Sequence, residues 1–155
     1  MKGTLLLGSL IIGAGYYYAK NSFNALLKKY KNAFQELDIE LNSLRNLNIT
    51  GSKLTADVIL NLINPTDIDL GVDAKNLVIL KKLIFYTQSG LFIGEAYPSL
   101  ANIMLPRNST LTTPEIPVEI PLDINAINVG FELLLNSRNI KVVTEIEALN
   151  NTYTF

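Results

Sequence analysis

Hydrophobic and polar positions alternate with a period of two over most of the chain beyond about residue 36, a pattern typical of strands with one buried face. The clearest stretch runs from Leu54 to Leu62. A second, from Glu115 to Leu122, places prolines opposite its apolar positions, which favours the edge of a sheet because proline has no backbone donor. The turn residues Gln88-Ser89-Gly90 predict a hairpin. Turn signals at this spacing predict a mainly β fold, a β-sandwich.

Three further elements follow from the same pattern. Alternation at Ile68, Leu70 and Val72 predicts a strand, and Ile140 to Ala148 predicts the last long one. Between them, Asp123 is a candidate N-cap for a short helix in the C-terminal half that ends near Asn136, because apolar residues recur there at helical spacing.

The amino-terminal segment has a different pattern. Residues 3–19 carry no charge and are bounded by Lys2 and Lys20. Such a run predicts a transmembrane-type helix at the short end of the spanning range, with tyrosines at the level of the lipid headgroups. The residues expected to form this membrane anchor are Leu5, Leu6, Leu7, Leu10, Ile11, Ile12, Tyr16, Tyr17 and Tyr18.

Two other interpretations of this run remain open. A secretory signal peptide also has a basic start, an apolar centre and small residues such as Gly13 and Gly15 near a cleavage site. Alternatively, a short apolar helix packs among other subunits of a large assembly, where protein replaces lipid.

An amphipathic helix is predicted directly after the run. From Ser22 onward, apolar residues recur at spacings of three and four, with lysines on the other side. This helix either lies on anionic headgroups or packs its apolar stripe against its own domain. The lysines expected to face headgroups are Lys20, Lys28, Lys29 and Lys31.

Charge separates the same two parts of the chain. Residues 1–35 contain five lysines and no acid, whereas the remainder contains 8 basic and 14 acidic residues. We therefore expect two regions: residues 1–35, the anchor with its basic helix, and residues 36–155, the β-sandwich domain. The formal net charge of −1 gives no electrostatic basis for nucleic-acid binding.

A family resemblance rests on the stretch LTADVILNLINPT at Leu54 to Thr66, followed by IDLGV at Ile68 to Val72. With the Gly90 to Glu95 hairpin, it resembles the late embryogenesis abundant type two proteins, also described as the water stress and hypersensitive response (WHy) domain, over roughly residues 36–149. The resemblance implies a small sandwich of the fibronectin or immunoglobulin general type. It also implies no known catalytic centre, frequent membrane attachment and contact with other macromolecules. The basic helix and the helix beginning at Asp123 depart from the shortest members of that family.

The motif of the resemblance, Asn64-Pro65-Thr66, also has a purely local explanation. Proline disfavours helical backbone in the residue before it, and the asparagine side chain closes a turn on nearby backbone. We therefore expect a structural turn between two strands, not a ligand site.

No constellation in the chain points to catalysis or to a bound cofactor or metal. The sequence has no Cys and no His, which removes the thiolate nucleophile and the commonest proton shuttle and zinc ligand. Asp67, Asp69 and Asp73 do not fit a calcium loop, because residues 72 and 78 are both Val where glycine and glutamate are needed. We expect these acids on the solvent face of a strand, and Glu145 with Glu147 on another.

These observations predict a non-enzymatic, membrane-tethered binding or structural module with a single-pass amino-terminal anchor. Its expected partners are the lipid bilayer and other protein subunits, with no small-molecule substrate. The alternative is a structural subunit of a large assembly, such as an envelope complex or a membrane-containing virion. A third class, a hydrolase using Asp67, Asp69, Glu145 or Glu147, has no spacing that selects a pair.

Overall fold

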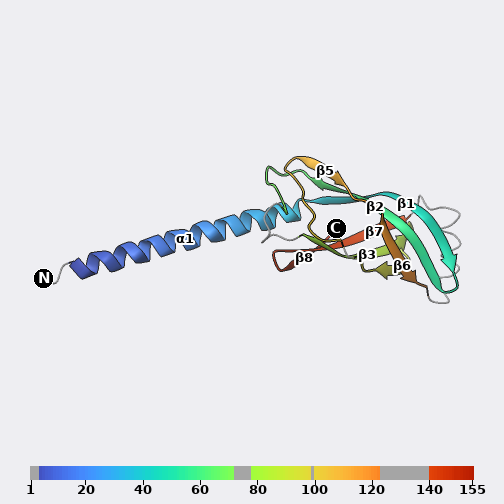
Figure 1. The fold of residues 1–155 in the computed structure, drawn as a ribbon, viewed down its shortest axis with the longest axis horizontal. Coiled ribbons are helices and arrows are strands. Elements are labelled where there is room, and N and C mark those ends of the chain that lie inside the picture. Colours follow the sequence, from blue (N-terminus) through green and yellow to red (C-terminus); the bar gives the residue numbers. More distant parts are fainter. Residues whose placement is uncertain (1–3, 72–77, 99, 123–139) are drawn as a thin grey trace.

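The computed structural model describes residues 4–71, 78–98, 100–122 and 140–155, with residues 4–19 described by their helical backbone. These residues form one long helix and eight strands. The helix and most of the strands run roughly along the long axis of the molecule (Figure 1). In chain order the elements are α1 (Thr4–Gln35), β1 (Asp38–Thr50), β2 (Lys53–Asn64), β3 (Ile79–Thr87), β4 (Phe92–Ala96), β5 (Ser109–Thr112), β6 (Ile116–Pro121), β7 (Ile140–Ala148) and β8 (Asn151–Thr154).

The strands make two antiparallel sheets. In the first, β1 pairs with one side of β2, while β5 and β6 share the other side. The second has the order β4-β3-β7-β8. The prediction of a mainly β fold is therefore confirmed.

Alternation of side chains produces the core between the sheets. In β2, Leu54, Ala56, Val58, Leu60 and Leu62 are all buried and lie on the inner face. They meet buried residues of the second sheet such as Phe85, Ile93 and Ile146. Burial of this many apolar side chains is the main favourable term for the fold.

Strand β6 carries prolines on its exposed positions, as predicted. Ile116, Val118 and Ile120 are buried, whereas Pro117 and Pro121 are exposed. Within the described residues β6 pairs only with β2, so its other side is a sheet edge. The prediction of a proline-bearing edge strand is confirmed.

The hairpin between β3 and β4 also forms where the sequence predicts it. Gly90 has φ 87°, a left-handed conformation that glycine adopts without strain. The Gly90 N–H donates to the carbonyl of Thr87 (2.9 Å), and the Thr87 N–H donates to the carbonyl of Leu91 (2.9 Å).

One predicted strand is wrong. The segment containing Ile68 and Leu70 is a loop, and only Leu70 makes an isolated bridge, to Leu105. The reason is topological, because the chain here leaves β2 in the first sheet to reach β3 in the second. Gly71 has φ 77°, and a Cβ at this position would lie 2.0 Å from the carbonyl oxygen of Ile103. Asp67 and Asp69 therefore do not lie on a strand, while Val72, Asp73 and the predicted helix from Asp123 to Asn136 lie outside the described residues.

Candidate functional site: the projecting helix and its junction with the sheets

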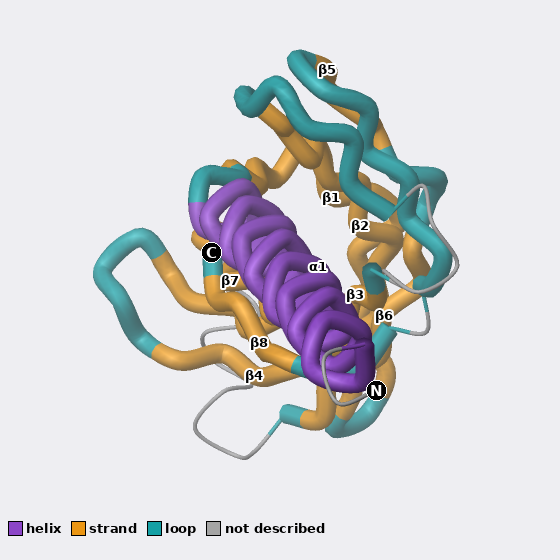
Figure 2. Tube along the Cα trace, turned by 90° about the vertical axis from the view of Figure 1, so that its left-hand side faces the viewer, coloured by secondary structure: helices purple, strands orange, loops and turns teal. Residues whose placement is uncertain are grey.

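Helix α1 is continuous and projects away from one end of the two sheets (Figure 1). Seen along its axis, it stands over that end and not against the outside of either sheet (Figure 2). Its 32 residues correspond to about 48 Å at the α-helical rise. The uncharged run and the basic segment thus belong to one helix, with the nine predicted anchor residues in its first half at Leu5, Leu6, Leu7, Leu10, Ile11, Ile12, Tyr16, Tyr17 and Tyr18.

The last turn of α1 is embedded in the core. Ala33 and Phe34 are 2% and 0% exposed, and Leu37, just beyond the helix, is 6% exposed. The Phe34 ring lies 5.4 Å from the ring of Tyr153, which is in β8 near the other end of the chain. Burial raises the pKa of the Tyr153 hydroxyl. The helix is therefore fixed to the domain by packing, with its final turn inside the unit that folds.

The apolar stripe of the predicted amphipathic segment has two different environments. Near the domain, Tyr30 packs partly against the core. Further out, Phe23 is 59% and Leu26 is 51% exposed. The inner end of the stripe thus packs on its own domain, as one of the two expectations has it, while its outer portion has no cover among the described residues. The basic positions Lys20, Lys28, Lys29 and Lys31 are all exposed.

The turn Asn64-Pro65-Thr66 lies beside the helix junction and is held by the side chain of Asn64, which is 1% exposed. Its Nδ2 donates to the carbonyls of Ile68 (2.8 Å), Leu105 (3.1 Å) and Pro106 (3.0 Å). Its Oδ1 accepts from the N–H (3.1 Å) and the hydroxyl (2.7 Å) of Thr66. Both ends of the amide are satisfied within the chain, and the turn leads from β2 into a loop and not directly into a second strand.

A hollow of about 410 Å³ lies between the end of α1 and this turn. Charged side chains of both signs border it, among them Lys29, Glu36 and Asp67. Within the described part of the chain, no three His, Cys, Asp or Glu side chains are grouped as metal ligands. The lining of this hollow is too exposed to enclose a reacting group.

The carboxylates considered for hydrolysis do not form a catalytic pair in the described residues, and two of them, Asp69 and Glu147, already contact other groups of the chain. Asp69 accepts the N–H of Arg107 (2.8 Å) in the loop after β2. Glu147, on β7, pairs with Lys81 (2.8 Å). Glu145 lies across from Lys82 on β3, but the Lys82 ammonium pairs instead with Glu95 (2.7 Å).

The Lys82–Glu95 pair extends to Tyr97, whose hydroxyl donates to Glu95 and whose ring lies 5.8 Å from the Lys82 nitrogen. The hydrogen bond from Lys82 lowers the pKa of Glu95, and the same contact raises the pKa of Lys82. The hydrogen bond to Glu95 raises the pKa of Tyr97. All three groups are thus held more firmly in the states they already have at neutral pH.

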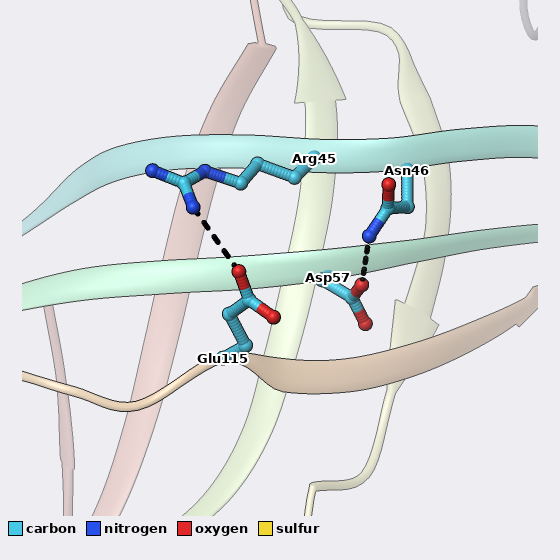
Figure 3. A network of polar contacts seen from close by, with 4 residues as sticks. All are labelled: Arg45, Asn46, Asp57 and Glu115. Atoms are coloured by element: carbon cyan, nitrogen blue, oxygen red, sulfur yellow. Dashed lines mark hydrogen bonds and ion pairs between the residues drawn. The ribbon is translucent and has the colours of Figure 1, made fainter.

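The outer face of the first sheet carries a polar network that the sequence analysis did not find. Arg45 pairs with Glu115 (3.1 Å), and the amide of Asn46 donates to Asp57 (2.6 Å), as Figure 3 shows. Asn46 has φ 51°, at a break in the β1–β2 register. These side chains satisfy one another, which is typical of a solvated face.

Among the residues that the structure describes, no helix combines the length and the apolar character needed to cross a membrane.

No family model and no curated protein sequence matches the chain. Among solved structures, a protein from Archaeoglobus fulgidus is similar over 77% of this chain and 87% of its own, with 8% identity and a TM-score of 0.39. A β-glucuronidase of glycoside hydrolase family 2 is similar over 77% of this chain, with 13% identity and a TM-score of 0.36, but this chain spans only 11% of its length. Likenesses this weak carry no argument about function.

The junction gives a prediction for stability. Replacing Phe34 by Ala should cost about 3–4 kcal/mol, because it opens a cavity where helix and sheets meet. A chain of this size should then melt about 10 °C lower, measured by circular dichroism in detergent. Replacing Phe23 by Ala, on the exposed part of the same helix, is the control and should leave the melting temperature nearly unchanged. Equal effects of the two substitutions would contradict a buried junction.

Proposed function

We propose that the chain is a non-enzymatic binding or structural module that α1 tethers to a membrane. The observation that carries the proposal is a single helix with an uncharged first half, projecting from the sheets, and a last turn buried in their core. A helix that left the domain only to complete its fold would bury its length against the sheets. This one instead holds its uncharged portion away from them (Figure 1).

In this proposal the uncharged run contacts lipid and the lysines lie near the headgroups. With residues 3–19 in hydrocarbon, Lys20 marks the boundary. Lys28 to Lys31 then stand about 12–17 Å further along the axis. Because the helix is continuous, this segment acts as a short basic stalk, and anionic lipids attract it within roughly a Debye length of the surface.

The proposed fold type is a sandwich of the fibronectin or immunoglobulin general kind, as the resemblance to the late embryogenesis abundant type two proteins implies. Two stacked antiparallel sheets and the closed Asn64 turn are compatible with it. The proposed lack of catalysis is supported by the engagement of Asp69, Glu147 and Glu95 in contacts within the chain.

Membrane extraction tests the tether. Full-length protein is expressed in cells, and the membranes are washed with alkaline carbonate. We expect the protein to remain in the membrane pellet. A matched variant with Leu10→Lys and Ile11→Lys keeps every other residue but places two charges in the apolar run, at roughly 2–3 kcal/mol each for insertion, and should move to the supernatant. Full-length protein in the supernatant would contradict the proposal.

A second function, structural subunit of a large assembly such as an envelope complex or a membrane-containing virion, is favoured by the exposed Phe23 and Leu26. These side chains lie beyond the proposed lipid boundary at Lys20, where a neighbouring protein would cover them. Replacing both by Ser separates the two functions. A tethered module keeps its membrane association, whereas an assembly subunit loses incorporation into the particle.

A further inference from the structure

The outer face of the second sheet carries apolar residues at its centre. Ile84 on β3 and Val143 on β7 are neighbours in register and both partly exposed, although neither packs against the core. Beside them, the rings of Tyr86 and Phe92 meet edge-on at 6.0 Å, and Phe92 is 57% exposed. We call these four residues the outer apolar patch.

Two charged side chains of opposite sign flank this patch along β7. Lys141 lies across from Tyr86, and Glu145 lies across from Lys82. Within the described residues neither makes an ion pair, whereas Lys81, Lys82, Glu95 and Glu147 on the same sheet all do. Lys141 and Glu145 are each two residues from Val143, and all three project from the same side of the strand.

We propose that this face binds the same face of a second copy of the chain, in an antiparallel arrangement with a two-fold axis at Val143. An axis across the strands places Lys141 of each copy against Glu145 of the other, giving two equivalent ion pairs around the apolar patch. An axis along the strands instead places Lys141 on Lys141 and Glu145 on Glu145. Charge thus selects the antiparallel arrangement, and the apolar patch supplies the area that it buries.

The partner that fits is therefore a second copy, because the face is complementary to itself. The outer face of the first sheet lacks this property. Its charged residues Arg45, Glu115, Lys53 and Glu119 already pair within one chain, at 3.1 Å and 2.5 Å.

The arrangement has a consequence that rests on the proposed function. Helix α1 leaves from one end of the strands (Figure 1). In an antiparallel pair the two α1 helices leave from opposite ends of the dimer. Both helices therefore cannot enter one membrane perpendicular to its plane. The dimer would connect two membrane surfaces.

A charge-swap series tests the contact. The full-length protein is purified in detergent, and the protein mass of the particle is measured by light scattering at micromolar concentration. We expect a dimer. K141E or E145K each turns two attractive contacts into two repulsive ones and should weaken dimerisation at least about tenfold. The double variant K141E/E145K exchanges the charges and should restore the dimer. R107E has the same charge change as K141E on a loop away from the face and should leave the dimer intact.

Cross-linking tests the direction of packing, because the natural chain has no cysteine. Facing sheets lie about 10 Å apart, so a short bis-maleimide reagent spans them. V143C should cross-link to itself, and a mixture of K141C with E145C should cross-link, whereas K141C alone should not.

The proposal is overturned by a monomeric full-length chain, by a dimer that both single reversals leave intact, or by a double variant that stays monomeric. The first outcome would assign cover of this face to another protein, and the second would place the dimer contact elsewhere, for example on α1. Melting curves of each variant check folding. Dimer mass in detergent does not depend on whether the helix enters lipid, so this test and the carbonate extraction can fail independently.

Discussion

Replacing Leu60 by Asp is expected to unfold the domain. Leu60 is 1% exposed at the centre of β2, the strand that pairs with β1, β5 and β6. The substitution removes a buried aliphatic side chain and places a carboxylate in the core, where no described side chain offers it a positive charge. The cost should exceed about 4 kcal/mol, a large part of the stability of an ordinary domain. Far-UV circular dichroism should show loss of the β signal.

The neighbouring residue provides the control for this experiment. Asn61 points to the other face of β2, where its Oδ1 accepts from Asn42 (3.1 Å) and from Thr112 (2.9 Å). Replacing Asn61 by Asp introduces the same charge one position away and keeps both acceptor contacts. The variant should remain folded, with urea denaturation within about 0.5 kcal/mol of the natural chain. A folded Leu60 variant would contradict the inward orientation of that residue.

Replacing Asn64 by Asp is expected to have the second-largest effect, although the two side chains have almost the same shape. The amide nitrogen of Asn64 donates to three carbonyls, those of Ile68, Leu105 and Pro106. A carboxylate would set a negative oxygen against these oxygens, inside a site that is 1% exposed. We expect a loss of about 3–5 kcal/mol at neutral pH, measured by urea denaturation.

The pH dependence of the Asn64→Asp variant distinguishes this cause from a general packing defect. The three carbonyls and burial raise the pKa of the introduced carboxyl in the folded state. A raised folded-state pKa means that the protonated acid is favoured by folding, so relative stability is highest below the unfolded pKa of about 4 and falls as the pH rises through the folded value. Replacing Asn64 by Ala, which leaves the three carbonyls without a donor but adds no charge, should show a pH-independent loss. Equal behaviour of the two variants would contradict the hydrogen-bond explanation.

Local pattern was sufficient for the parts of the fold that depend on one strand at a time. The alternation in β2, the prolines of β6 and the turn at Gly90 each follow from rules that act over a few residues. The same rule was wrong at Ile68 and Leu70. There the chain crosses between the sheets, and the alternating residues lie in a loop that the backbone bridge between Leu70 and Leu105 holds in place.

Long-range pairings were beyond the sequence analysis for a physical reason. Arg45 and Glu115 are 70 residues apart, and only the placement of β6 beside β2 brings them together. The burial of Phe34 is similar, because the helical period marks an apolar stripe but does not say where the domain covers it and where it ends. The exposed Phe23 and the buried Phe34 have the same pattern in sequence and different surroundings in the fold.

The buried last turn of α1 also determines how motion passes along the molecule. Many tethered domains hang on flexible linkers and sample all directions. Here Ala33 and Phe34 fix the final turn of α1 in the core, so the helix continues into the sheets without a flexible joint. A tilt or rotation of α1 therefore turns the two sheets by the same angle. The helix acts as a lever that transmits a movement of its outer end to the sheets.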